Sequence, residues 1–412
     1  MQSSYKWVVL ISAFIIYLFD SLEIAILSFA LPAISGEFGL QPVQAGLLAT
    51  ATLLGMGVSG PIMGWLADNK GRKFALNVCL VLFIVLTVAI YFVPNFAVFL
   101  VLRFLAGVGL GGVWSIISAI VVETWPAHQR GKAVAFVLAS FPIGGVAAAQ
   151  LASWIMPHWR EMFLVAGLAA ILPLFLSMFV LKESAEWREQ HIQSQQESGK
   201  GSVSVKEIFA PGLSRVTILA SLVATAAFIA YYGASTWLPS YLEAERGLDV
   251  KTVGQFMTWL NLGMFAGYIV FGWLADKIGK KNALLLSMFG SGVLMPLYGV
   301  VTDQSVLLWL GPLYAFFMTF AGLFGSYLGE LFPTRVRATG AGFTFNVGRG
   351  ISAFAPMLLG GIAVATSLST GLVVAGLIFL VGGVFLIFLP KAPSDCKSKT
   401  EDSTLMGVTA DA

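Results

Sequence analysis

The stretch Gly64-Trp-Leu-Ala-Asp-Asn-Lys-Gly-Arg-Lys73 occurs twice in this chain with small changes. Its second copy, Gly272-Trp-Leu-Ala-Asp-Lys-Ile-Gly-Lys-Lys281, follows 208 residues later. Another pair of segments, Glu123-Thr-Trp-Pro126 and Glu330-Leu-Phe-Pro333, repeats at an offset of 207 residues. Two independent matches at nearly one offset indicate a duplicated chain, in which each half carries both segments at the same place.

The rest of the chain is too apolar for a soluble protein. Of its 412 residues, 58% are hydrophobic and 11% are charged, and the mean hydropathy is +0.85. Soluble domains carry about 25% charged residues, and a chain of this length could not bury so much apolar surface by itself. The bilayer must therefore be its solvent. The net charge of +3 is small and dispersed, which gives no indication of nucleic-acid binding.

Apolar runs of the length that a membrane-spanning helix requires recur from end to end. We predict an all-α membrane protein with twelve transmembrane helices in two pseudo-symmetric six-helix bundles. The expected organisation is an N-terminal bundle over 1–181, a cytoplasmic linker over 182–214, a C-terminal bundle over 215–390 and a cytoplasmic tail over 391–412. The expected helices cover residues 7–30, 43–67, 74–93, 95–120, 131–155, 162–181, 216–241, 252–275, 283–301, 305–329, 339–363 and 369–390.

Positive charges predict the orientation of such a bundle, because cytoplasmic loops carry an excess of Lys and Arg. If the N-terminus is inside, nineteen of the 24 Lys and Arg residues fall in cytoplasmic segments and three fall in external loops. We therefore expect both termini in the cytoplasm. The expected location is the lipid bilayer of a bacterial inner membrane, which the chain crosses many times.

Four charged residues lie inside the predicted helices, where a charge is costly and is therefore a candidate for function. Asp20, Arg103 and Arg349 fall at similar depths, about 12 to 15 Å from the nearer helix end, and Glu23 shares a helix face with Asp20. An anionic substrate adds one negative charge to such a cluster, and protonation of one acid removes it. We expect Arg349 to bind the substrate, and Asp20, Glu23 and Arg103 to couple it to a proton. The alternative is that these residues form structural ion pairs.

Aromatic and amide side chains inside the helices are further candidates for the substrate site. Such residues more often pack against neighbours or lie at the membrane interface, so this alternative stays open for each of them. The candidates are Trp114, Gln150, Tyr231, Trp237, Asn261 and Asn346.

The repeated loops are candidates for a cytoplasmic gate. Asp68 ends one helix and Arg72 begins the next, while Gly71 permits the tight turn between them. An aspartate at this place can pair with the arginine or with the partial positive charge of a helix N-terminus, and such a contact can form in one conformation only. The alternative is simple anchoring by positive charge. The corresponding residues of the second half are Asp276, Gly279 and Lys280.

These loops resemble the signature loop of the major facilitator superfamily, whose members consist of two related six-helix halves. The segment that begins Leu102-Arg103-Phe resembles the superfamily's fourth-helix motif, which is associated with proton coupling. Within the superfamily, several segments resemble the proton symporters of sialate and aromatic acids. The first helix of these symporters carries a D-G-F-D pattern, and Asp20 matches its second aspartate. This chain departs from the pattern in two ways, because Tyr17 replaces the first aspartate and Glu23 is additional. The segments that carry the resemblance are Phe19-Asp20, Gly36-Glu-Phe-Gly-Leu40, Glu123-Thr-Trp-Pro-Ala-His-Gln-Arg130, Trp237-Leu-Pro-Ser-Tyr-Leu242 and Gly348-Arg349.

The resemblance and the buried charges together predict a secondary transporter that takes up a small organic anion with a proton. The substrate would be a sialic, aromatic or other monocarboxylic acid. A drug or metabolite antiporter of the same fold is the alternative, although Ser140-Phe-Pro-Ile-Gly-Gly145 lacks the first glycine of the antiporter motif. A membrane sensor that uses this fold only for binding is a third alternative, but it would need a signalling domain, and neither the linker nor the short tail offers one. The sequence contains no nucleotide-binding G-x-x-x-x-G-K-[ST] motif and suggests no enzyme, metal site or cofactor. We expect a monomer.

Overall fold

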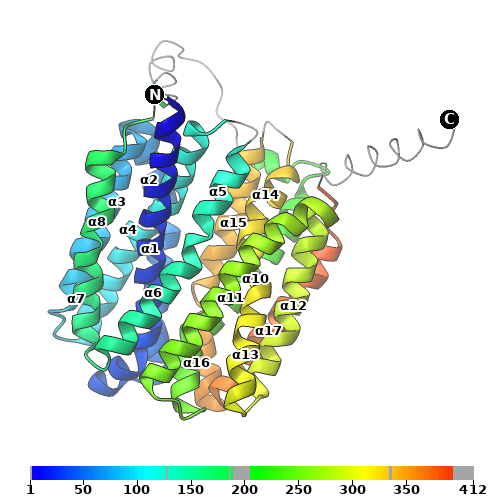
Figure 1. The fold of residues 1–412 in the computed structure, drawn as a ribbon. Helices are drawn as coiled ribbons and strands as arrows, with labels where there is room; N and C mark the ends of the chain where they lie inside the picture. The colour runs from blue at the N-terminus through cyan, green and yellow to red at the C-terminus, as the bar shows by residue number, and fades with distance from the viewer. Residues whose placement is uncertain (1, 127–128, 185–186, 189–204, 334–335, 393–412) are drawn as a thin grey trace.

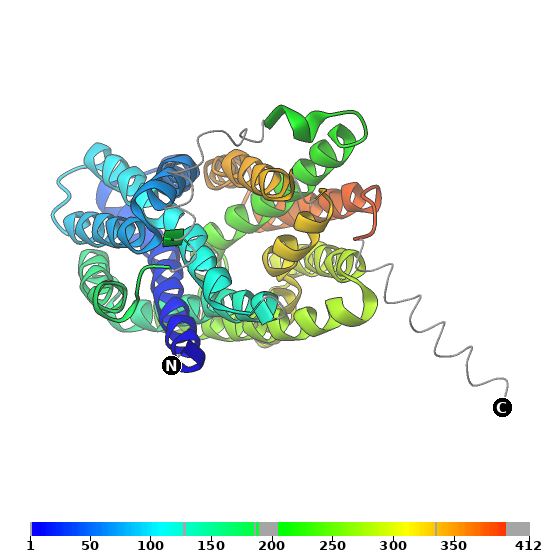
Figure 2. The ribbon, with the colours of Figure 1, turned by 90° about the horizontal axis from the view of Figure 1, so that it is seen from above.

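A computed structural model describes residues 2–126, 129–184, 187–188, 205–333 and 336–392, and within these ranges the chain is helical with no strand. Twelve spans in the described ranges are long and apolar enough to cross a membrane. The predicted all-α membrane fold with twelve spans is therefore confirmed. Figure 1 shows the helices running side by side, with the N-terminal half at the left and the C-terminal half at the right. Figure 2 shows the same two groups of helices from one end.

The helices of the two halves follow one another in the same order. The N-terminal half contains α1 (Gln2–Phe38), α2 (Pro42–Lys70), α3 (Arg72–Ile90), α4 (Phe96–Thr124), α5 (Arg130–Leu138), α6 (Ser140–Ile155), α7 (Trp159–Ala169), α8 (Ile171–Phe175) and the π-helix η2 (Leu176–Val180). The 3-10 helix η3 (Val205–Phe209) precedes the second half. The C-terminal half contains α10 (Ser214–Ala244), α11 (Val250–Ile278), α12 (Lys280–Val300), α13 (Gln304–Phe317), α14 (Phe320–Glu330), α15 (Arg337–Ser352), α16 (Ala355–Ala365) and α17 (Leu368–Ile387).

Several spans consist of two successive helices, which the sequence analysis did not anticipate. The fifth span breaks at Ala139, three residues before Pro142, and the eleventh breaks at Ala353 and Phe354, just before Pro356. Proline lacks a backbone N–H and is tolerated in the first turn of a helix, so each proline marks the start of the second piece. The first helix, in contrast, continues past Pro32 to Phe38 instead of ending near residue 30 as expected.

Glycines allow equivalent helices of the two halves to pack backbone against backbone. In the first half, a Cβ on Gly55 of α2 would lie 2.0 Å from the carbonyl oxygen of Phe104 on α4. In the second half, a Cβ on Gly263 of α11 would lie 2.2 Å from the carbonyl oxygen of Pro312 on α13. Only glycine fits at either place. Gly55 and Gly263 are 208 positions apart, and so are Phe104 and Pro312. The duplication therefore extends to the packing of the helices.

We refer to the helix ends that carry the repeated loops as the cytoplasmic ends and to the opposite ends as the external ends, following the expected orientation. Large exposed aromatic side chains lie near both sets of ends. Trp65 and Trp273, at equivalent positions of the repeat, lie near the cytoplasmic ends, and Trp154 and Trp309 lie near the external ends. Tryptophan is enriched at the two membrane interfaces, so these residues are placed where a bilayer would begin and end.

A third repeat lies at the external ends, and the sequence analysis missed it. Glu37-Phe-Gly-Leu40 and Glu245-Arg-Gly-Leu248 are 208 residues apart, and both glycines have a positive φ, 63° for Gly39 and 67° for Gly247. Glu37 accepts hydrogen bonds from the Trp159 indole and the Arg160 guanidinium. Glu245 accepts them from the backbone N–H groups of Leu368 and Ser369 at the start of α17. Each glutamate thereby joins the first and sixth spans of its half.

Candidate transport site

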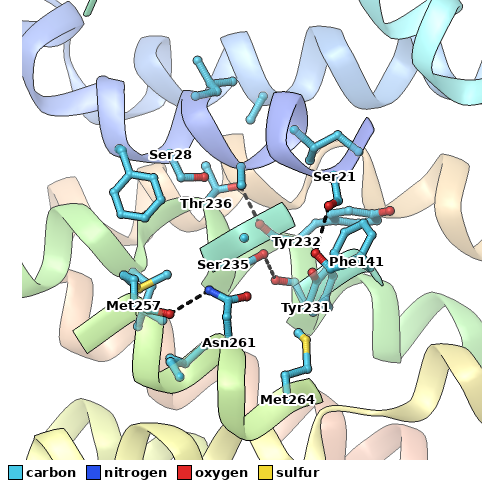
Figure 3. Close-up of a pocket in the computed structure, with 18 of the residues that line it drawn as sticks. Ser21, Ser28, Phe141, Tyr231, Tyr232, Ser235, Thr236, Met257, Asn261 and Met264 are labelled. Atoms are coloured by element: carbon cyan, nitrogen blue, oxygen red, sulfur yellow. Dashed lines mark hydrogen bonds between the residues drawn. The ribbon is translucent and has the colours of Figure 1, made fainter. Parts of the chain in front are cut away.

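A cavity lies between the two halves (Figure 3). Its lining residues come mostly from the parts of the helices nearer the external ends. The empty space between its side chains is about 930 Å³, including the part that opens to solvent. Helices α1, α2, α4 and α6 form one wall, and α10, α11 and α13 form the other. The lining residues are Ser21, Ile24, Ala25, Leu27, Ser28, Phe29, Ala49, Thr52, Leu53, Arg103, Phe141, Gly145, Tyr231, Tyr232, Ser235, Thr236, Leu238, Met257, Leu260, Asn261, Met264, Tyr314 and Met318.

The halves touch closely on the external side of this cavity. Along the seam of α2 and α16, a Cβ on Gly46 would lie 2.7 Å from the carbonyl oxygen of Pro356. Along the seam of α6 and α11, a Cβ on Gly254 would lie 2.9 Å from the Ser153 Cβ. The second seam also contains a hydrogen bond between the halves, from Gln150 Nε2 to Thr258 Oγ1 at 2.7 Å. These contacts close the external end around the cavity.

Aromatic rings form a layer on the cytoplasmic side of the cavity and continue from one half to the other. Tyr17 lies 4.7 Å from Trp114 and 5.8 Å from Phe141, as measured between ring centroids. Phe141 in turn lies 6.4 Å from Tyr231 of the C-terminal half. Two of the predicted aromatic candidates belong to this layer. Tyr231 lines the cavity, whereas Trp114 packs against Tyr17 and is not a lining residue.

The predicted cluster of four buried charges is divided into two pairs of different character. The first pair is closed. Arg103 donates a hydrogen bond of 2.8 Å to the Glu23 carboxylate and another of 2.9 Å to the Thr52 hydroxyl, and its guanidinium lies 5.6 Å from the centre of the Phe163 ring. The side chains of Arg103 and Glu23 are almost fully buried. Every member of this group belongs to the N-terminal half.

The second pair is open and joins the two halves. Asp20 of α1 and Arg349 of α15 are close enough to interact electrostatically, but no hydrogen bond connects them. Asp20 Oδ1 and Arg349 Nε are both buried and have no hydrogen-bond partner among the described residues. Arg349 contacts the Met56 sulfur at 3.5 Å, and the Tyr232 hydroxyl lies beside its guanidinium. This pair therefore consists of a buried aspartate and a half-buried arginine, each with one buried polar atom that has no partner among the described residues.

The structure also shows which residues around the open pair the sequence analysis missed. Tyr17 and Tyr232 lie near Arg349, and Met56 contacts it. Tyr232 lines the cavity, whereas neither Asp20 nor Arg349 is among its lining residues. One signal was present, since Tyr17 was recognised as a departure from the helix-one pattern. Its ring lies one turn before Asp20, within the electrostatic neighbourhood of both charges.

The remaining predicted substrate residues lie in different places. Asn261 lines the cavity. Trp237 is buried, and its indole N–H donates to the Pro356 carbonyl at 2.8 Å. This hydrogen bond joins α10 to α16. Gln150 belongs to the external seam described above, and Asn346 is exposed on α15, where its amide donates to the Gly342 carbonyl. None of Trp237, Gln150 and Asn346 is among the lining residues of the cavity.

The predicted gate residues lie at the cytoplasmic ends. Arg72 pairs with Glu123 at 3.2 Å, and Lys280 pairs with Glu330, so the two repeated segments of each half meet in an ion pair. Gly71 and Gly279 have φ values of 107° and 90°, which explains why glycine occupies both turns. Asp276 is exposed and forms no ion pair with a described residue. The side chain of Asp68 lies outside the part of the chain that the structure describes.

One residue of these loops was not predicted. Glu183, just after the sixth span, accepts hydrogen bonds from the backbone N–H groups of Arg72 and Lys73 and so caps the start of α3. In the second half a cation takes the corresponding place, because Lys281 at the start of α12 donates to the carbonyl oxygens of Ile387, the last residue of α17, and of Leu389. The sequence offered no signal for Glu183, because it lies in a polar stretch assigned to the linker.

Comparison with known proteins agrees with this architecture. A family model described as Major Facilitator Superfamily matches residues 11–356. The cis,cis-muconate transport protein of Acinetobacter baylyi is 32% identical over 388 residues, which cover 92% of this chain and 94% of that protein. A sialic acid transporter of Escherichia coli is 30% identical over 362 residues, which cover 85% of each chain.

Solved structures show the same fold at lower identity. The xylose transporter of Escherichia coli in an inward-open conformation matches with a TM-score of 0.77 and 17% identity, over 94% of this chain and 97% of that one. The chain is thus a multi-pass membrane transporter and not an enzyme, and it belongs to the major facilitator superfamily, among relatives that transport organic acids.

Proposed function

We propose that this transporter takes up a small organic anion, a monocarboxylate, together with a proton. The observation that carries the proposal is the open pair of Asp20 and Arg349 between the halves. The guanidinium of Arg349 has a buried Nε–H group without a partner among the described residues, so it can bind a further anionic group. A buried carboxylate without a hydrogen bond is costly in its charged form and is therefore suited to take up a proton.

Arg349 is the residue we assign to the substrate carboxylate. Arginine presents a planar fork of donors that matches a carboxylate in two parallel hydrogen bonds. Arg103 lines the cavity, whereas Arg349 lies behind the lining residue Tyr232, but the guanidinium of Arg103 is already bound to Glu23 and Thr52. A substrate at Arg103 would have to break a buried ion pair, whereas a substrate at Arg349 fills vacant hydrogen-bonding capacity.

Asp20 is the residue we assign to the proton. When the substrate anion binds, Arg349 faces two negative charges unless one of them is neutralised. Protonation of Asp20 removes its charge and leaves Arg349 to the substrate, so the anion and the proton are bound most favourably together. Glu23 is less suited to this role, because a proton on Glu23 would break its ion pair with Arg103.

Transport requires the cavity to open to each side in turn. In this proposal, the halves 1–181 and 215–390 rock against each other, with both termini and the linker in the cytoplasm of a bacterium and the transporter in the inner membrane as a monomer. Asp20 and Arg349 lie on opposite halves, so rocking changes their separation and with it the stability of the charged aspartate. Relatives named for muconate and sialic acid support an organic acid as the substrate.

The proposal is tested by uptake into proteoliposomes. A panel of radiolabelled carboxylates, including benzoate, nicotinate, muconate and sialic acid, is offered with and without an inward proton gradient. We expect at least one of them to be concentrated inside only when the gradient is present. Accumulation driven by a gradient of the opposite direction would instead indicate antiport, and equilibration without accumulation would indicate uniport.

A further inference from the structure

The polar side chains of the cavity differ in whether their donor and acceptor groups already have hydrogen-bond partners (Figure 3). The hydroxyls of Ser21, Ser235 and Thr236 each donate to a backbone carbonyl, at 2.9, 2.5 and 2.7 Å. A hydroxyl whose hydrogen is used in this way can only accept from a substrate, and its donor capacity is no longer available. Asn261 also donates to a carbonyl, but it retains a complete second group, the amide oxygen.

The orientation of the Asn261 amide is fixed by its neighbours. Nδ2 donates to the carbonyl oxygen of Met257 at 2.8 Å, one turn earlier on α11. An amide oxygen cannot take this place, because the carbonyl needs a donor, so Oδ1 must point the other way. There the amide rests on the bare Cα of Gly145 of the other half, where an added Cβ would lie 2.3 Å from Oδ1. The described residues supply no hydrogen bond to Oδ1.

Asn261 is also placed at a distance from the residue assigned to the carboxylate. Counted from the external ends of α11 and α16, Asn261 lies about 16 Å deep and Arg349 about 24 Å deep, from the rise of 1.5 Å per residue. The two backbone positions thus differ by about 8 Å along the helix axes, which is of the order of the length of a benzoate with a substituent opposite its carboxylate. Arg349 is not itself a lining residue, but Tyr232, which lies beside its guanidinium, lines the cavity together with Asn261. An anion of that size bound at Arg349 would therefore extend past Tyr232 toward Asn261.

The wall between these two points is largely apolar. Met257, Leu260 and Met264 follow one another on the cavity face of α11, at the spacing of one side of a helix. A polyhydroxylated anion in this place would leave several hydroxyl groups without partners, at a cost for each of them. A flat, largely apolar body suits the wall better, since sulfur and methylene groups adapt to a ring face.

We propose that Asn261 is a specificity-determining residue, whose side-chain oxygen accepts a hydrogen bond from a donor group at the end of the substrate opposite its carboxylate. This inference rests on the proposed function, because it takes Arg349 as the carboxylate partner. It assigns the preferred substrate to flat monocarboxylates that carry a hydroxyl or amino group at the far end. An amide oxygen accepts only, so Asn261 selects for a donor group on the substrate.

The test compares two probes of nearly equal size, 4-aminobenzoate, which can donate, and 4-methylbenzoate, which cannot. Their affinities for the purified full-length protein are measured by calorimetric titration, without any proton gradient. We expect wild type to bind 4-aminobenzoate about tenfold more tightly, as one additional hydrogen bond allows. Asn261→Leu should weaken 4-aminobenzoate alone and bring the two affinities together. Asn261→Ala, which needs no extra space, serves if the leucine variant does not fold.

A matched control is Asn282→Leu, because Asn282 makes the same bond to a carbonyl one turn earlier, Ile278, but is exposed at the start of α12. It should keep the tenfold ratio. Equal affinities in wild type, an unchanged ratio in Asn261→Leu, equal weakening of both probes or failure of both probes to bind would each overturn the inference. Because no gradient is used, these results are independent of proton coupling, whose failure appears only in the uptake experiment.

Discussion

Asp20 and Glu23 lie one helical turn apart on α1, and each is paired with an arginine. The two pairs differ in whether their polar atoms have hydrogen-bond partners. Glu23 and Arg103 are in direct contact at 2.8 Å, and Thr52 and Phe163 complete the surroundings of the arginine. Asp20 and Arg349 face each other without a hydrogen bond, and each retains a buried polar atom without a partner.

The difference follows from where the partners come from. Glu23, Arg103 and Thr52 all belong to the half that contains α1, so their geometry survives any movement between the halves. Asp20 and Arg349 belong to different halves, so their geometry depends on that movement. A fully satisfied pair is suited to hold helices together, and a partly satisfied pair between moving bodies is suited to respond to a ligand and a proton.

The largest expected effect comes from breaking the closed pair on one side only. Arg103→Leu leaves the Glu23 carboxylate buried without its cation, and we expect a loss of about 3 to 5 kcal/mol in stability. Thermal unfolding of the purified protein in detergent measures this loss. The double variant Glu23→Leu/Arg103→Leu should recover most of it, because no unpaired charge remains. An unchanged melting temperature in the single variant would contradict a structural role for the pair.

The corresponding change in the open pair should affect binding rather than stability. Arg349→Ala removes the partner of the substrate carboxylate, and we expect affinity for the best substrate of the uptake panel to fall about a hundredfold. Arg349→Lys should restore part of it, because lysine supplies the charge without the two parallel hydrogen bonds. Equilibrium binding and thermal unfolding are measured on the same preparations. A large fall in melting temperature with unchanged affinity would reverse the roles of the two pairs.

A smaller effect is expected from a neutral contact between the halves. Gln150→Ala removes the hydrogen bond to Thr258 in the external seam and should shift the protein about threefold toward an externally open form. The shift is measured in a variant without Cys79 and Cys396, as faster labelling of Ser28→Cys by an impermeant thiol reagent added from outside. Thr258→Val should act in the same direction. Slower or unchanged labelling in both variants would show that this bond does not hold the external end closed.

Sequence reasoning predicted the architecture because the repeats and the apolar runs are strong signals. It did not predict the division of the charges, since depth along a helix says nothing about the direction in which a side chain points. The same ambiguity explains the substrate candidates. Transmembrane helices are apolar on all sides, so no periodicity showed that Asn261 lines the cavity while Gln150 and Asn346 do not. The repeat of Glu37 and Glu245 could have been found by a search at the same offset.

The most direct test of the account concerns Asp20, which it assigns as the proton site. Asp20→Asn has a permanently neutral side chain of nearly the same shape, so substrate binding and exchange of internal for external substrate should persist in proteoliposomes. Accumulation driven by an inward proton gradient should be lost, because the amide cannot release a proton. Glu23→Gln serves as the comparison and should be less stable than wild type, with accumulation retained in the protein that remains folded. If Asp20→Asn still concentrates substrate against its gradient, Asp20 is not the proton site and the central assignment is wrong.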